Sequence, residues 1–160
     1  DSLDLTHITI TGEIPSEIGD LINLTHLNIN CTNQDQDDWL SGEIPVSIGN
    51  LENLSTLIIY DTHITGEVPS TITNLNNLTV LILNYNELLS IPENIENLNN
   101  LEIFWICYNN LTSLPESICN LPENCDIDVS RNNLCEEYHY DCLDNSEWQD
   151  GYDGLQDCQE

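Results

Sequence analysis

A short apolar pattern repeats along this chain, and the repetition limits its fold more than any other feature. The spacing is L-x-x-L-x-x-L-x-L-x-x-N/T, and one clear copy runs from Leu75 through Leu83 to Asn86. A proline keeps step with the pattern, once in each of five copies. A nearly fixed period of this kind predicts a solenoid, in which each repeat forms one coil. The prolines are Pro15, Pro45, Pro69, Pro92 and Pro115.

Each copy contains two apolar residues separated by one other residue, such as Leu81 and Leu83. This alternation predicts a short strand with one buried face. Stacked coils would place these strands side by side in a parallel sheet, about 4.8 Å apart. Asn86 and its equivalents follow the strand, where an amide side chain can bond neighbouring backbone groups. The return arm, such as residues 66–72, is too short for a long helix.

The segments 41–45 and 65–69, which read SGEIP and TGEVP, resemble the plant-type subclass of the leucine-rich repeat family. The resemblance covers residues 1 to about 134. It implies an α/β solenoid, a right-handed coil of about six repeats with a concave parallel β-sheet and an irregular or 3-10 convex side. It also implies a non-enzymatic module, because family members usually bind proteins, peptides or glycans on the concave sheet. We expect a solenoid at 1–134, with an acidic insertion at about 33–39, and a Cys-rich acidic cap at 135–160.

The charge of the chain is extreme, with 29 acidic residues against one basic residue, Arg131. Such a surface repels nucleic acid and anionic membranes, and it suits divalent cations, high salt or a basic partner. No apolar run is long enough to span a bilayer, so we expect no membrane insertion. The histidines fall in different phases of the repeat and no phosphate-binding loop is present, so we expect no enzyme and no cofactor. Asp35, Asp37 and Asp38 are candidate calcium ligands, although their spacing is not that of an EF-hand.

Six of the seven cysteines come after residue 106. This clustering predicts a disulfide-stapled cap in an oxidising compartment, and hence an extracellular or cell-surface protein. Cys31 lies three coils from the next cysteine, about 14 Å at the usual strand spacing, which is too far for a disulfide. We therefore expect Cys31 to be unpaired in its own chain. The disulfide candidates, whose pairing stays open, are Cys107, Cys119, Cys125, Cys135, Cys142 and Cys158.

The residues beside the inward apolar pair face outward, onto the concave sheet. Aligning the coils predicts three outward rows, the third of which includes Tyr60, Asn84 and Cys107. Together the rows form an apolar and aromatic patch, the composition of a partner-contact site. Two alternatives are that the tail after residue 135 covers the patch, or that β-propensity alone selects these residues. The expected partner-binding residues are Ile58, Tyr60, Val80, Ile82, Tyr85, Ile103, Trp105, Tyr108 and, in the insertion, Trp39.

Five N-x-S/T triplets are candidate glycosylation sites for a secreted chain. Three of them hold the same place in successive coils, so their sugars would line one face. The alternative is that N-L-S/T simply belongs to the repeat pattern of an Asn-rich chain. The five asparagines are Asn23, Asn30, Asn53, Asn77 and Asn110.

The chain begins almost directly on the strand Leu3-Asp4-Leu5, without a preceding cap. An open strand edge invites pairing, and a head-to-tail contact that does not close propagates into a filament. Cys31 lies near this end and fits such an assembly. We therefore favour an extracellular module that works through protein contacts and self-assembles. The alternatives are a receptor or adhesin ectodomain that binds a protein, peptide or glycan, and a cation- or ice-interacting surface protein.

Overall fold

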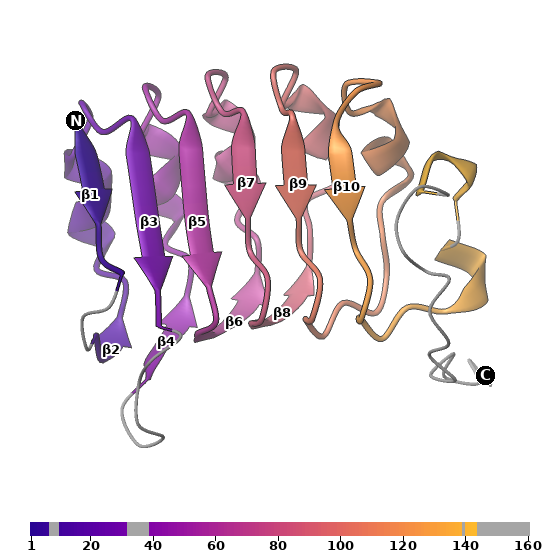
Figure 1. Ribbon diagram of the computed structural model, residues 1–160, viewed down its shortest axis with the longest axis horizontal. Helices are drawn as coiled ribbons and strands as arrows, with labels where there is room; N and C mark the ends of the chain where they lie inside the picture. Colours follow the sequence, from indigo (N-terminus) through magenta and orange to yellow (C-terminus); the bar gives the residue numbers. More distant parts are fainter. Residues whose placement is uncertain (7–9, 32–38, 139, 144–160) are drawn as a thin grey trace.

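The computed structural model describes residues 1–6, 10–31, 39–138 and 140–143. Successive coils stack along one axis, and a six-stranded parallel sheet forms one face of the solenoid (Figure 1). The order of the strands in this sheet follows the order of the chain, as expected from the repeat. The strands are β1 (Ser2–Asp4), β3 (His26–Asn30), β5 (Thr56–Tyr60), β7 (Val80–Ile82), β9 (Ile103–Trp105) and β10 (Asp126–Asp128).

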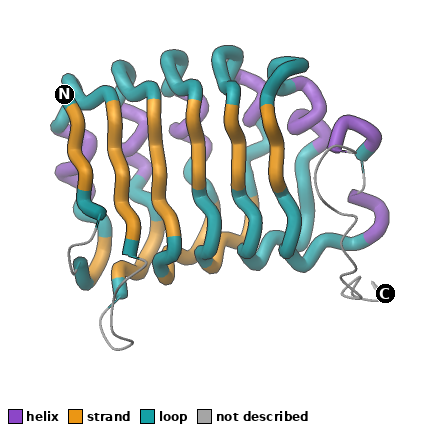
Figure 2. Tube along the Cα trace, in the orientation of Figure 1, coloured by secondary structure: helices purple, strands orange, loops and turns teal. Residues whose placement is uncertain are grey.

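A row of 3-10 helices lies on the opposite side of the solenoid from this sheet (Figure 2). The prolines of the repeat explain their position. The carbonyl of Pro45 accepts a hydrogen bond from the N–H of Ile48 at 2.9 Å, and Pro69 and Ile72 repeat the contact one coil later. The helices are η1 (Ser16–Asp20), η2 (Val46–Asn50), η3 (Ser70–Asn74), η4 (Ile95–Asn97) and η5 (Glu116–Asn120).

The interior is one continuous apolar column. Leu57, Leu81 and Phe104 are adjacent through the register of β5, β7 and β9, and each has no exposed surface. Side chains that lie one repeat apart in the sequence are therefore neighbours in space. Burial of one such side chain stabilises the fold by about 2 kcal/mol, which explains why the repeat keeps apolar residues at these positions.

The sequence did not lead us to expect a second sheet. Four short strands pair in parallel along one edge of the solenoid, and the sheet ends with the fourth. Gly66 lies within it at φ 76°, a left-handed conformation that glycine adopts without strain. The strands are β2 (Gly12–Glu13), β4 (Leu40–Glu43), β6 (His63–Glu67) and β8 (Glu87–Ser90).

The return arms of the first coils approach one another very closely. A Cβ atom added to Gly49 would lie 2.4 Å from the carbonyl oxygen of Thr71, and one added to Gly19 would lie 2.5 Å from that of Ser47. Only glycine allows this approach of backbone to backbone.

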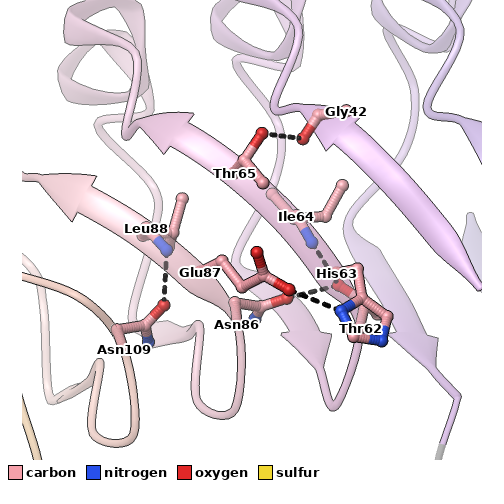
Figure 3. A network of polar contacts seen from close by, with 9 residues as sticks. All are labelled: Gly42, Thr62, His63, Ile64, Thr65, Asn86, Glu87, Leu88 and Asn109. Atoms are coloured by element: carbon pink, nitrogen blue, oxygen red, sulfur yellow. Dashed lines mark hydrogen bonds and ion pairs between the residues drawn. The ribbon is translucent and has the colours of Figure 1, made fainter.

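Amide side chains bond the later coils at the turn that follows each strand, as expected. The Nδ2 of Asn86 donates to the carbonyl of Ile59 in the preceding coil at 2.9 Å. The Nδ2 of Asn109 donates in the same way to Leu83 at 2.9 Å, and that of Asn132 to Ile106 at 3.0 Å. We call Asn86, Asn109 and Asn132 the amide ladder (Figure 3 shows its first two members).

A cap closes the C-terminal end of the described solenoid. Its two 3-10 turns are η6 (Glu136–Tyr138) and η7 (Asp141–Leu143), and Leu143 is 2% exposed. A disulfide joins Cys119 to Cys142, with 5.5 Å between their Cα atoms. Cys135 is also disulfide-bonded, whereas Cys158 lies outside the described residues.

Two of the expected disulfide cysteines are free, so that prediction is wrong for Cys107 and Cys125. Cys107 is buried just after β9, beside Asp128 of the neighbouring strand β10 and away from the cap. Cys125 precedes β10 and is half-buried. Cys31 is free as expected, but at 1% exposure its thiol is inaccessible to another chain. The contribution expected of Cys31 to an assembly edge is therefore wrong.

Candidate functional site

The concave sheet carries the apolar residues expected there, in two rows that cross the strands. The register pairs Thr56 with Val80 and Val80 with Ile103 in the first row. In the second row it pairs Ile58 with Ile82 and Ile82 with Trp105. None of these side chains is buried, because their neighbours in the strand supply the interior. We call Ile58, Val80, Ile82, Ile103 and Trp105 the concave patch.

Three tyrosines extend this patch, one at the end of β5 and two at the turns that follow β7 and β9. The rings of Tyr85 and Tyr108 stack with 4.3 Å between centroids, and Tyr60 lies 5.3 Å from Tyr85. Tyr85 and Tyr108 occupy equivalent left-handed positions, at φ 57° and 55°, which places successive rings above one another. They stay 39% and 42% exposed. The rings therefore present a continuous aromatic surface, which we call the tyrosine stack.

The surroundings of Tyr85 favour the neutral form of its side chain. Desolvation, together with the hydrogen bond and charge of Tyr108, raises the pKa of Tyr85 to about 12. The guanidinium of Arg131 lies 5.8 Å from the centroid of the Tyr108 ring, a cation–π contact. The single basic residue of the chain thus lies at the end of the stack.

Carboxylates lie at both ends of the six-stranded sheet, and those on β10 border the concave patch. The register places Asp126 beside Ile103 and Asp128 beside Trp105. The indole N–H of Trp105 donates to Oδ2 of Asp126 at 3.0 Å, which fixes the orientation of both side chains. At the other end, Asp4 is exposed in the same row as Asp128.

The third expected row is wrong in the later coils. Asn84 and Cys107 are each 6% exposed, because β7 ends at Ile82 and β9 at Trp105, before the outward alternation reaches them. Oδ1 of Asn84 instead accepts the backbone N–H of Cys107 at 2.9 Å. Tyr60 remains in the row because β5 continues through it.

The structure separates Trp39 from the concave patch. Its ring packs against the core and meets His63 edge to face, with 4.8 Å between centroids. Nδ1 of His63 lies 2.5 Å from Oε1 of Glu87 on the neighbouring strand (Figure 3). We did not expect this cluster, although His63 and Glu87 are separated by one repeat, and this spacing could have revealed it. The calcium candidates Asp35, Asp37 and Asp38 lie outside the described residues.

Two of the repeated triplets bond neighbouring coils. Nδ2 of Asn53 donates to the carbonyl of Ile22 at 2.9 Å, and Nδ2 of Asn77 donates to that of Glu52 at 2.8 Å. The hydroxyl of Ser55 likewise donates to Thr25 at 2.9 Å. The N-L-S/T pattern therefore has a structural role in stacking. Glycosylation stays a prediction, and its exposed candidates are Asn23, Asn53, Asn77 and Asn110, with Asn30 half-buried.

The described residues hold no group of three or more His, Cys, Asp or Glu side chains that could bind a metal ion. In the same part of the chain, no helix is long and apolar enough to cross a membrane. One polar hollow of about 460 Å³ lies on the convex side, and its lining is Glu52, Thr73, Asn74, Asn76, Asn97 and Asn99.

The first strand has one partner in its sheet. β1 pairs with β3, and its outer edge is unpaired among the described residues. Leu3 and Leu5 are half-buried against the core, whereas Asp4 is exposed. The role expected of Leu3, Asp4 and Leu5 in assembly stays a prediction.

A family model, described as a leucine-rich repeat region, matches residues 3–123. This chain belongs to the leucine-rich repeat family. The match does not distinguish the plant-type subclass, which stays a prediction. No curated protein among those compared matches the chain.

Several solved structures of plant proteins are similar in fold to this chain. The ectodomain of the receptor kinase GASSHO1/SCHENGEN3 from Arabidopsis thaliana, in complex with CASPARIAN STRIP INTEGRITY FACTOR 2, is 34% identical with a TM-score of 0.71. The match covers 82% of this chain and 15% of that ectodomain. A plant ice-binding protein is 33% identical with a TM-score of 0.70, over 84% of this chain and 41% of that one. The BIR3–SERK2 complex from Arabidopsis thaliana contains a chain that is 28% identical with a TM-score of 0.69. That match covers 83% of this chain and 68% of the other.

Proposed function

We propose that this chain is an extracellular binding module that holds a peptide or protein ligand on the concave patch and the adjoining tyrosine stack. The observation that carries the proposal is the placement of five half-exposed apolar and indole side chains on three adjacent strands, where a solvent-facing sheet would ordinarily be polar. Clusters of this composition mark contact sites.

Three further observations support the proposal. The similar ectodomain of GASSHO1/SCHENGEN3 was solved in complex with CASPARIAN STRIP INTEGRITY FACTOR 2, and the PEPR1–AtPEP1 structure is likewise similar. The disulfide between Cys119 and Cys142 fits an oxidising compartment outside the cell. Binding would require little rearrangement, because β5, β7 and β9 already hold the patch in register.

The test is a selection of binders from a random peptide library displayed on phage, followed by affinity measurements. The concave variant combines Ile82→Ser with Trp105→Ala. The control is Val46→Ser, which removes an apolar side chain that is 70% exposed on the convex side. We expect the selected peptides to bind the concave variant at least about tenfold more weakly and the control unchanged.

Two results would overturn the proposal: a selection that enriches no binder, or binders whose affinity is the same for the concave variant and the wild type. Circular dichroism and urea unfolding of each variant show whether a loss of binding reflects a loss of folding. Peptides that bind the control variant but not a folded concave variant support the proposal.

Head-to-tail self-assembly and ice interaction are the alternatives. The unpaired edge of β1 favours the first, but the cap at Leu143 covers the core at the opposite end of the described solenoid. The plant ice-binding neighbour favours the second. Sedimentation velocity at increasing concentration tests assembly, and thermal hysteresis of a frozen sample tests ice interaction. We expect a monomer and no hysteresis.

A further inference from the structure

We propose that the ligand of the concave patch is a cationic amphipathic peptide segment of another protein, with apolar side chains against the patch and a lysine or arginine against Asp126 and Asp128. This inference rests on the proposed function and adds the chemistry of the partner. Its basis is charge complementarity between the borders of the patch and the bound segment.

The acidic border lies within reach of a side chain seated on the patch. β10 is the direct neighbour of β9, so Asp126 and Asp128 lie one strand, about 4.8 Å, from Ile103 and Trp105. Both carboxylates belong to exposed or half-buried residues. A cation above the Trp105 indole would gain a cation–π contact and a charge-assisted hydrogen bond at the same time.

The hydrogen bond from Trp105 to Asp126 supports this arrangement. The indole N–H bonds only Oδ2 of Asp126, and this holds the carboxylate against the edge of the indole ring. Because the donor is neutral, the negative charge of the carboxylate is not cancelled. Oδ1 of Asp128 accepts the backbone N–H of Ser130 at 2.9 Å, which fixes the second carboxylate in the same way. The site is therefore pre-organised, with two carboxylates held beside an aromatic face.

A partner other than this chain best provides the complementary charge. The only basic residue of the chain is Arg131, which lies over the Tyr108 ring. The sequence of residues 144–160 contains several acidic residues and no basic one, so this segment would be repelled by the border. A second copy carries the same net charge of -28 and would be repelled too. A basic segment of a different protein is thus the favoured occupant.

The size of the sheet indicates the length of the segment. Six strands at about 4.8 Å span about 24 Å from β1 to β10, which an extended peptide of about seven residues crosses. Alternate residues of such a peptide face the sheet. Two apolar residues would therefore lie on the patch, with a basic residue two positions beyond them at the border of Asp126 and Asp128.

The test uses the peptides selected from the phage library at about 150 mM salt, where weak, non-specific attraction is screened. The border variant combines Asp126→Asn with Asp128→Asn, which keeps both hydrogen-bond acceptors and removes two charges. The control combines Glu17→Gln with Asp20→Asn on η1, which removes two exposed charges far from the patch. We expect peptides enriched in lysine or arginine that bind the border variant about tenfold more weakly and the control within about twofold.

The outcomes separate this inference from the function on which it depends. Patch-dependent peptides without enrichment of basic residues, or with equal affinity for the border variant, would refute the cationic ligand and leave the binding module intact. Equal losses of affinity in the border and control variants would show that the peptides are attracted to the net charge of the protein alone. This result would also refute the cationic ligand. Peptides that bind the concave variant as tightly as the wild type would refute both the cationic ligand and the binding module.

Discussion

Substitution of Asn109 by alanine tests whether the amide ladder holds the later coils together. Asn109 is 5% exposed, and its Oδ1 accepts the backbone N–H of Leu88 in the preceding coil at 2.9 Å. Its Nδ2 donates to the carbonyls of Leu83 at 2.9 Å and Ile106 at 3.1 Å. One side chain thus bonds backbone groups in two coils.

The cost of the change follows from what each backbone group loses. Leu83 O also accepts from Asn86, and Ile106 O also accepts from Asn132, so each carbonyl keeps one donor. The N–H of Leu88 loses the amide oxygen inside the protein, which costs about 1–3 kcal/mol. Weaker bonding of the two carbonyls adds about 1 kcal/mol, so we expect a total loss of about 3 kcal/mol.

Urea unfolding followed by circular dichroism measures this loss. At a slope of about 2 kcal/mol/M, a loss of about 3 kcal/mol lowers the unfolding midpoint by about 1.5 M. The matched control is Asn110→Ala, because Asn110 is the next residue, is exposed, and donates to the carbonyl of Leu88 through its backbone N–H. If the two variants unfold within about 0.5 kcal/mol of each other, the ladder does not hold the coils.

Two further changes test close packing and a buried thiol. Gly49→Ala would place a Cβ 2.4 Å from a carbonyl oxygen, so it should lower the free energy of unfolding by about 3 kcal/mol. The control Gly12→Ala meets open space and should lower it by about 1 kcal/mol, because alanine is strained at the φ of 87°. Equal losses of stability in urea unfolding would contradict the close approach at Gly49. Burial and Asp128 raise the pKa of Cys107 from 9.0 to about 12, so the folded protein keeps this thiol protonated while the unfolded chain ionises above pH 9. Stability should therefore fall as pH rises from 9 toward 12, and the stability deficit of Cys107→Ala should shrink by about 1 kcal/mol per pH unit in that window. A deficit that stays constant between pH 8 and pH 10.5 would contradict this assignment.

The period of the repeat was enough to predict which side chains are neighbours. Ile58, Ile82 and Trp105 share a row because each follows the last by one repeat, and stacking turns this spacing into register. The same reasoning failed at Asn84 and Cys107. The chain leaves the strand there and turns through left-handed Tyr85 and Tyr108, so alternation no longer decides which side faces water.

Neither the second sheet nor the disulfide pairing could be predicted from the sequence, and the reasons differ. The second-sheet segments are short and rich in glycine and polar residues, so β4 does not show the alternation of a half-buried strand. Disulfide pairing depends on which way a cysteine points at the end of a coil. Cys107 and Cys119 lie close together in the sequence, yet the first is a free thiol beside Asp128 of β10 and the second is bonded to Cys142 of the cap.

Two devices reinforce the six-stranded sheet that joins all the coils, and they lie in different parts of the chain. Backbone pairing between β2, β4, β6 and β8 joins the early coils along the second edge, and this sheet stops at Ser90. From Asn86 onward, carboxamide groups perform the same task. Both devices meet within a single turn, where Leu88 belongs to the last strand and also donates to Asn109. Fraying that starts at either terminus would therefore be resisted at this turn, because both sets of bonds couple the coils on its two sides.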